Sequence, residues 1–242
     1  MSTNPAMAAI GQEVSIGGRS LVIESLLAEG GFASVYLATN RPELVAVGGS
    51  GGRTEHFVLK KMFAGGPEAV AQLTAEVRLM ERLKHPNIVR VYGTDMKRTG
   101  GDGVDIYVLM EFCPGGTLLS SINKVAEGAA PPLSLTRLLE TLVSIVRPVA
   151  YLHSLSPPIA HRDLKFENVL IAADGTLRLC DFGSCSTHAG PADDRADRAA
   201  QEDAIARFTT PAFRSPEMVD LYSGSPLDTR VDVWALGCLA YG

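Results

Sequence analysis

The chain is 242 residues long, 46% of its residues are hydrophobic, and its formal net charge is −5. A chain of this size and hydrophobic content can bury a full core, so we expect a globular protein. A protein with a net negative charge is not expected to carry the large basic surface that attracts nucleic acids and anionic membranes, so we expect neither as a partner.

The N-terminus, the apolar runs and the cysteines indicate a soluble, cytoplasmic protein. Residues 1–11 lack the basic and apolar blocks of a signal peptide, and Arg147 and Asp232 break the longest candidates for a transmembrane segment. The four cysteines have no metal-ligand or disulfide-framework spacing, which is typical of a reducing compartment. They are Cys113, Cys180, Cys185 and Cys238.

Residues 19–110 predict a small, mostly β lobe that carries one helix. Residues 1–18 are polar and contain glycine, so we expect a flexible N-terminal tail there. The pattern from residue 21 to residue 57 is strand-like, and Gly48 to Gly52 predict a flexible hairpin within it. The helix is predicted to begin at Pro67 and to end at His85-Pro86, and two strands follow at residues 88–91 and 106–110.

Residues 111–116 predict a hinge, and residues 117–242 predict a mainly helical second lobe, which gives an α+β fold class. Ser134 is the expected N-cap of a helix with a long apolar stripe. Pro148 lies inside that stripe and should kink the helix, at a cost of about 3 kcal/mol if nothing compensates. Short strands are predicted at residues 169–171 and 177–179, and a mobile charged segment at residues 191–198.

Two motifs carry the strongest chemical signal. Residues 161–168 have the sequence His-Arg-Asp-Leu-Lys-Phe-Glu-Asn, and Asp-Phe-Gly follows at residues 181–183. Together they resemble the catalytic motifs of eukaryotic protein kinases, which implies a bilobal kinase-like fold that uses ATP and Mg²⁺. The resemblance implies these roles: Asp163 as the base for the acceptor hydroxyl, Lys165 beside the γ-phosphate, and Asn168 and Asp181 as Mg²⁺ ligands.

Residues 27–35 resemble the glycine-rich loop of kinases, which brings backbone N–H groups close to the phosphates. Ala28 and Ala33 stand where two of its three glycines are usual, and Gly30 remains in register, followed by Gly31. Taken alone, the segment would be better interpreted as a plain β-turn. Its position upstream of the catalytic motifs favours the nucleotide-binding loop.

Lys60 fits the lysine that grips the α- and β-phosphates, with Glu76 on the following helix as its ion-pair partner. The alternative is a solvated surface pair. Lys60 ends an apolar strand pattern and Glu76 sits beside the apolar stripe of its helix, which favours the functional interpretation. Lys61 is the competing lysine, and strand alternation points it to the other face.

Residues 107–113 resemble the strand and hinge that bind adenine. Met110 would be the gatekeeper, and backbone groups of Glu111 and Cys113 would make the hydrogen bonds. Cys113 is better interpreted as a small hydrophobic residue than as a reactive thiol. The residues expected to enclose the purine are Val35, Val58 and Leu170.

Residues 208–217 resemble the end of an activation segment. Thr210 would hydrogen-bond Asp163 and Lys165, and Ser215 replaces the usual alanine of the Pro-Glu motif. These features, with Lys165, imply serine or threonine acceptors in a protein substrate.

Three further roles follow from the same resemblance. His161 would pack under Phe182 rather than act as a base. Arg162 would anchor the activation segment, for which a phosphate is one partner. Asp232 would hold the backbone of the catalytic loop from a buried central helix.

Several stretches resemble the Numb-associated kinase family, which includes the adaptor-associated and cyclin-G-associated kinases. They are residues 29–33, 111–116, 179–184, 202–205 and 214–224. This resemblance implies clathrin adaptor subunits as substrates, a location at endocytic or Golgi vesicles, and an extra helix near residues 218–222.

A kinase lobe normally extends well beyond its central helix, and we expect a truncated second lobe that leaves apolar residues of this helix uncovered. They are Val233, Trp234, Leu236, Leu239 and Tyr241. Two alternatives to an active kinase therefore stay open: a pseudokinase that binds ATP as an adaptor, and an inactive kinase fragment.

Overall fold

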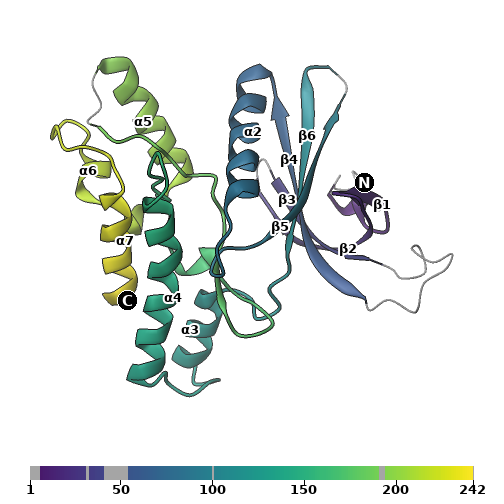
Figure 1. The fold of residues 1–242 in the computed structure, drawn as a ribbon, viewed down its shortest axis with the longest axis horizontal. Coiled ribbons are helices and arrows are strands. Elements are labelled where there is room, and N and C mark those ends of the chain that lie inside the picture. Colours follow the sequence, from purple (N-terminus) through teal and green to yellow (C-terminus); the bar gives the residue numbers. More distant parts are fainter. Residues whose placement is uncertain (1–5, 31–32, 41–53, 100, 191–193, 242) are drawn as a thin grey trace. The chain divides into compact units, whose positions relative to one another are not determined.

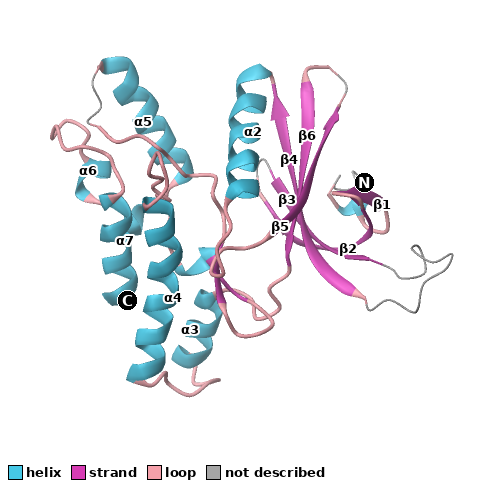
Figure 2. Cartoon of the chain, in the orientation of Figure 1, coloured by secondary structure: helices cyan, strands magenta, loops and turns pink. Residues whose placement is uncertain are grey.

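The computed structural model describes residues 6–30, 33–40, 54–99, 101–190 and 194–241. The chain divides into two compact units, each of which can be followed in Figures 1 and 2. The first unit contains residues 1–84 and 89–112, and the second contains residues 85–88 and 113–242. The last passage of the chain from the first unit to the second, after residue 112, lies within the segment 111–116, for which a hinge was predicted.

The first unit is built on a six-stranded sheet with the order β1-β2-β3-β4-β6-β5. Neighbouring strands are antiparallel throughout. The strands are β1 (Glu13–Ile16), β2 (Arg19–Glu29), β3 (Ala33–Asn40), β4 (Glu55–Gly65), β5 (Val91–Arg98) and β6 (Gly103–Glu111).

One helix, α2 (Pro67–Arg82), packs on this sheet against β4, β5 and β6 (Figure 1). Proline at the first helical position, Glu68 in the first turn and Arg82 in the last turn all favour a helix with these ends. Val77 and Met80 are its buried residues. The helix predicted from apolar spacing is confirmed.

The other face of the sheet carries its own core. The buried residues of this cluster are Ala6, Ile16, Leu21, Ile23, Tyr36, Ala38, Phe57, Leu59 and Leu109. Leu59 pairs with both Tyr36 and Leu109 in the strand register, so these side chains share one face, opposite to that of Lys60.

Two predictions for this unit are wrong in part. Residues 13–16 form strand β1, paired with β2, whereas a flexible tail was expected over residues 1–18. The strand predicted at residues 88–91 begins only at Val91, and Ile88 forms an isolated bridge with Leu179. Strand β5 is half-exposed and polar, so hydrophobic patterning did not reveal it. The hairpin predicted for Gly48 to Gly52 lies outside the described residues.

The second unit is mainly helical. Its helices are α3 (Leu118–Ala126), α4 (Leu135–His153), α5 (Arg195–Phe208), α6 (Pro216–Val219) and α7 (Arg230–Tyr241). The Ser134 hydroxyl accepts a hydrogen bond from the backbone N–H of Arg137 at 3.3 Å, which confirms the predicted N-cap of α4. Pro148 lies inside α4 and is buried.

A short antiparallel hairpin, β7 (Val169–Ile171) and β8 (Leu177–Leu179), has the predicted bounds. The segment expected to be mobile at residues 191–198 is helical from Arg195, at the start of α5. Good helix formers account for this, since only Ile205 of α5 is buried. An extra helix was expected near residues 218–222. Helix α6 covers only the start of that range, because it ends at Val219, so this prediction is wrong for the rest of it.

The predicted α+β class, with a β-rich first part and a helical second part, is confirmed. Among the described residues, no helix is both long and apolar enough to cross a membrane.

Candidate active site

Asp163 is the centre of a hydrogen-bonded cluster in the second unit, where it is 5% exposed. Asn168 Nδ2 donates to Asp163 Oδ2 at 3.0 Å and to the Asp163 carbonyl oxygen at 2.9 Å. Lys165 Nζ lies 2.8 Å from Oδ2. Thr210 donates to Oδ1 through its backbone N–H at 3.0 Å and its hydroxyl at 2.7 Å. Because each carboxylate oxygen receives two donors, the orientation of Asp163 is fixed.

Thr210 joins the lysine of this cluster to its carboxylate. Lys165 Nζ donates to Thr210 Oγ1 at 2.9 Å, in addition to its contact with Asp163. The hydrogen bonds predicted between Thr210 and these two residues are therefore present. They join the segment after α5 directly to the loop of residues 161–168.

Asp232 in α7 holds the backbone of that loop from a fully buried position. Its carboxylate accepts hydrogen bonds from the backbone N–H groups of His161 and Arg162, both at 2.8 Å. His153 Nε2 lies 2.8 Å from the same carboxylate. Arg162 has φ 66°, in the left-handed region that residues with side chains rarely adopt. The predicted role of Asp232 as a backbone anchor is confirmed, and it fixes the residue just before Asp163.

The two predicted metal ligands, Asn168 and Asp181, lie at the same end of the β7–β8 hairpin. Asn168 comes directly before β7 and Asp181 comes two residues after β8, and Val169 pairs with Leu179. The backbone N–H of Cys180 donates to the Asn168 carbonyl oxygen at 2.9 Å. Asp181 has φ 61° and is exposed.

Phe182 anchors the segment that follows Asp181. It is 3% exposed, and its ring packs edge-on against His161 with centroids 5.4 Å apart. His161 is fully buried, and its Nε2 lies 3.3 Å from the Cys180 carbonyl oxygen. The predicted packing role of His161 is confirmed.

In the first unit, Lys60 Nζ on β4 lies 3.4 Å from Glu76 Oε1 on α2. Both side chains are mostly buried, with exposed fractions of 18% and 12%. Lys61 points to the other face, where its Nζ lies 2.8 Å from Asp105 Oδ2. The geometry thus distinguishes the two lysines in the way that strand alternation predicted.

Strand register places most of the predicted nucleotide-binding residues of this unit on the face that carries α2. Val35 pairs with Lys60, and Val58 pairs with Met110. Residues two apart on β4 share a face, so all four side chains lie on the same side of the sheet as Glu76.

Glu111 and Cys113, which were predicted to contact adenine, each have a backbone group in a hydrogen bond within the protein. The Glu111 N–H donates to the Arg90 carbonyl oxygen at 2.8 Å, and the Cys113 carbonyl accepts from the Gly116 N–H at 3.2 Å. Cys113 is buried, as expected of a small hydrophobic residue, and belongs with Leu170 to the second unit.

The glycine-rich loop begins at the end of β2, where Ala28 pairs with Val35. The Gly30 N–H donates to the Ala33 carbonyl oxygen at 2.8 Å. A methyl group at Gly30 would come no closer than 3.9 Å to the atoms described, so the fold itself does not require glycine there. Gly31 lies outside the described residues.

Gln201 and Arg214 were missed in the sequence. Arg162, which was predicted to anchor the activation segment with a phosphate as one partner, donates through Nη1 to Gln201 Oε1 of α5 at 3.1 Å. Burial lowers the pKa of Arg162, and the nearby Asp232 carboxylate opposes that shift. Arg214 makes three hydrogen bonds at the C-terminal end of α5. No sequence motif marks these contacts, because they depend on the position of a helix that patterning did not predict.

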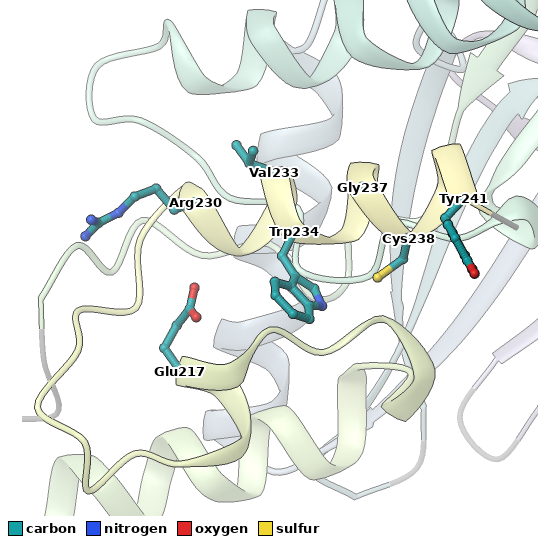
Figure 3. A pocket seen from close by; sticks show the side chains of 7 residues that line it. All are labelled: Glu217, Arg230, Val233, Trp234, Gly237, Cys238 and Tyr241. Atoms are coloured by element: carbon teal, nitrogen blue, oxygen red, sulfur yellow. The ribbon is translucent and has the colours of Figure 1, made fainter.

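A cavity of about 650 Å³ lies along α7, away from all predicted site residues. Figure 3 shows Trp234, Cys238 and Tyr241 projecting from one side of the helix. The predicted exposure of this face is confirmed for Val233, Trp234 and Tyr241, which are 58%, 48% and 96% exposed. It is wrong for Leu239, which is 4% exposed.

Comparison with known proteins identifies relatives over nearly the whole chain. The profile of the protein kinase domain matches residues 21–242. The chain is 36% identical to the serine/threonine-protein kinase ppk30 of Schizosaccharomyces pombe, over 96% of this chain and 23% of that protein. It is 37% identical to a probable serine/threonine-protein kinase of Dictyostelium discoideum, over 96% of this chain and 28% of that protein. The chain thus spans about a quarter of the length of these relatives.

Proposed function

Because the chain belongs to the protein kinase domain family, we propose that it transfers the γ-phosphate of ATP to serine or threonine hydroxyls of proteins. The observation that carries this proposal is the cluster of Asp163, Lys165, Asn168 and Thr210, in which a buried carboxylate is held by four donors. Phosphoryl transfer needs little covalent chemistry from the protein and depends on such positioning.

Asp163 is proposed to orient the acceptor hydroxyl and to accept its proton. In the structure, Lys165 and Asn168 share Oδ2 and Thr210 occupies Oδ1. When Lys165 turns to a phosphate oxygen, Oδ2 regains a lone pair for the incoming hydroxyl. The same ammonium group then balances negative charge on the transferred group.

Asn168 and Asp181 are proposed to hold Mg²⁺. Oxygen ligands are those that Mg²⁺ prefers, and both residues lie at the same end of the β7–β8 hairpin. Asn168 makes its two side-chain hydrogen bonds through its nitrogen, so they do not engage the amide oxygen, the atom that ligates metals. When bound, the ion would neutralise charge on the phosphates.

The other predicted site residues are proposed to bind the nucleotide. Lys60, oriented by Glu76, would bind the phosphates, and Ala28, Gly30 and Gly31 would lie over them. The purine would be enclosed by Val35, Val58 and Leu170, with Met110 as the gatekeeper. Backbone groups of Glu111 and Cys113 would make hydrogen bonds to adenine.

A narrower proposal rests on the motif resemblance to Numb-associated kinases. It assigns clathrin adaptor subunits as substrates and a cytoplasmic location at endocytic or Golgi vesicles. Phosphorylation of a purified adaptor subunit, at a rate above that for an unrelated protein of similar serine and threonine content, would support it. Equal rates for the two proteins would reject the adaptor-subunit proposal and would not affect the proposal of general kinase activity.

The test of the general activity uses the purified full-length protein, Mg-ATP and a panel of serine, threonine and tyrosine peptides. Asp163→Asn is expected to lower turnover by about 10²- to 10⁴-fold while largely preserving nucleotide binding. Asp181→Asn is expected to lower both turnover and Mg²⁺-dependent nucleotide binding. Unchanged phosphorylation in either variant would contradict the assigned roles.

A pseudokinase that binds ATP as an adaptor is the alternative from another class. The base, both lysines and both metal ligands are present, which favours the enzyme. Nucleotide binding without any transfer by the wild-type protein would favour the adaptor.

A further inference from the structure

Arg214 closes the C-terminal end of helix α5. The last carbonyl groups of a helix have no partner within it and need donors from elsewhere. Arg214 Nη2 donates to the carbonyl oxygens of Ile205 at 3.1 Å and Thr209 at 3.0 Å. Its Nε donates to the Thr209 hydroxyl oxygen at 2.8 Å. The guanidinium thus fixes both the last turn of α5 and the first residue after it.

The chain is also held at this point by its own contacts. The Thr209 N–H and hydroxyl both donate to the Ile205 carbonyl oxygen, at 3.2 Å and 2.6 Å. Ile205 is 4% exposed and packs in a buried cluster with Ala160 and Val231. Arg214 therefore attaches Thr209 to a helix turn that is itself anchored in the core of the second unit.

The next residue in the chain, Thr210, is the one that contacts the proposed base. Its N–H and its hydroxyl both donate to Asp163 Oδ1. One peptide bond therefore separates the residue that Arg214 fixes from the residue that fixes Asp163. A change in the position of Thr209 is transmitted directly to both hydrogen bonds.

We propose that Arg214 is a positioning residue for phosphoryl transfer, which acts on the Asp163 carboxylate through Thr209 and Thr210. This inference rests on the proposed function of Asp163 as the base. Among the described residues, Arg214 donates hydrogen bonds to Ile205 and Thr209, neither of which is proposed to bind the nucleotide, so its loss should affect turnover and spare ATP binding. Asp163 would keep its contacts with Asn168 and Lys165 and lose the restraint on Oδ1.

The chain offers a matched control in Arg207, which lies in the last turn of the same helix. Its side chain is 62% exposed, and among the described residues it forms an ion pair with Asp203, four residues earlier in the helix, at 3.2 Å. An exposed pair of this kind contributes little. Arg207→Met and Arg214→Met therefore remove the same charge from the same helix end, but only the second removes the contacts with Thr209.

The experiment compares Arg214→Met, Arg214→Lys and Arg207→Met in the full-length protein, by steady-state kinetics and nucleotide binding. Arg214→Met is expected to lower kcat about 10- to 100-fold, as a small misplacement of a catalytic group does. The KM for ATP should stay within about twofold, since no nucleotide contact is lost. Arg214→Lys should restore part of kcat, because an ammonium group keeps the charge without the fork of donors. Arg207→Met should match the wild type.

A double-mutant cycle with Thr210→Val separates positioning from a general loss of stability. If Arg214 acts through Thr210, Arg214→Met should lower kcat less in the Thr210→Val background than in the wild type, because valine keeps the backbone N–H bond to Asp163 Oδ1 and removes the hydroxyl bond. Equal fold-losses in both backgrounds, or a wild-type kcat for Arg214→Met, would overturn the inference. If Arg214→Met does not fold, the same double-mutant cycle is measured with Arg214→Lys.

Failure of the proposed function has a different signature. In that case the wild type would show no transfer above Asp163→Asn, whatever residue stands at position 214. Hydrogen exchange then decides the structural part of the inference. Arg214→Met should raise exchange at the Thr209 and Thr210 amides and Arg207→Met should not, and equal exchange in both variants would reject it.

Discussion

Replacement of Ser215 by alanine is expected to stabilise the protein. Ser215 is fully buried, and among the described residues its hydroxyl has no hydrogen-bond partner. It occupies the N-cap position of α6 without capping that helix through its side chain. Its backbone carbonyl accepts from the N–H groups of Met218 and Val219, and alanine would keep those bonds.

The magnitude follows from what the substitution removes. A buried hydroxyl without a partner costs about 1–3 kcal/mol. Loss of one oxygen atom forfeits several dispersion contacts of about 0.1–0.2 kcal/mol each. The net expectation for Ser215→Ala is about 1 kcal/mol of added stability, or a rise in Tm of about 2–4 °C for a chain of this size.

Ser134→Ala is the matched control, because the same atom is removed where it does make a bond. The Ser134 hydroxyl caps α4 through the Arg137 N–H at 3.3 Å. Its loss should cost about 1 kcal/mol. Thermal unfolding followed by circular dichroism, with urea denaturation as a second measurement, should give shifts of opposite sign for the two variants. A lower Tm for Ser215→Ala would refute the reasoning and indicate that the hydroxyl has a partner.

Three other predictions concern the two lysines, α5 and pH. Lys60→Met should abolish most transfer and Lys61→Met should leave it near wild type; the reverse result in a kinase assay would mean that the strand register is wrong. Gln201→Glu should give Arg162 a charged partner and slow hydrogen exchange across α5, since charge-assisted hydrogen bonds are stronger; faster exchange would count against it. Burial lowers the pKa of His85 below 6.5, so the folded state binds fewer protons and stability falls as pH drops below that value. When the pH is lowered from 7 to 5.5, the Tm of the wild type should therefore fall further than the Tm of His85→Asn. Equal falls in Tm would exclude a coupling between His85 protonation and stability.

Local chemistry in the sequence determined much of this protein. Apolar residues at helical spacing predicted α2, and Ser134 before an apolar stripe predicted the start of α4. The two short strands around the catalytic motifs were predicted with their observed bounds. The contacts of Thr210 and Asp232 with the catalytic loop were expected from motif resemblance. Such features are local or belong to motifs with fixed spacing, so a single sequence can carry them.

Other elements and contacts were decided only by the tertiary structure. Residues 13–16 alternate polar and apolar side chains, but four residues are too short a run to predict a strand, and β1 forms because β2 pairs with it. Helix α5 has one buried residue, so apolar periodicity could not predict it, although its composition favours a helix. The partners of Gln201 and Arg214 depend in turn on where α5 lies. Hydrogen-bond partners are chosen by proximity in space, and for these residues proximity exists only after the helix has packed.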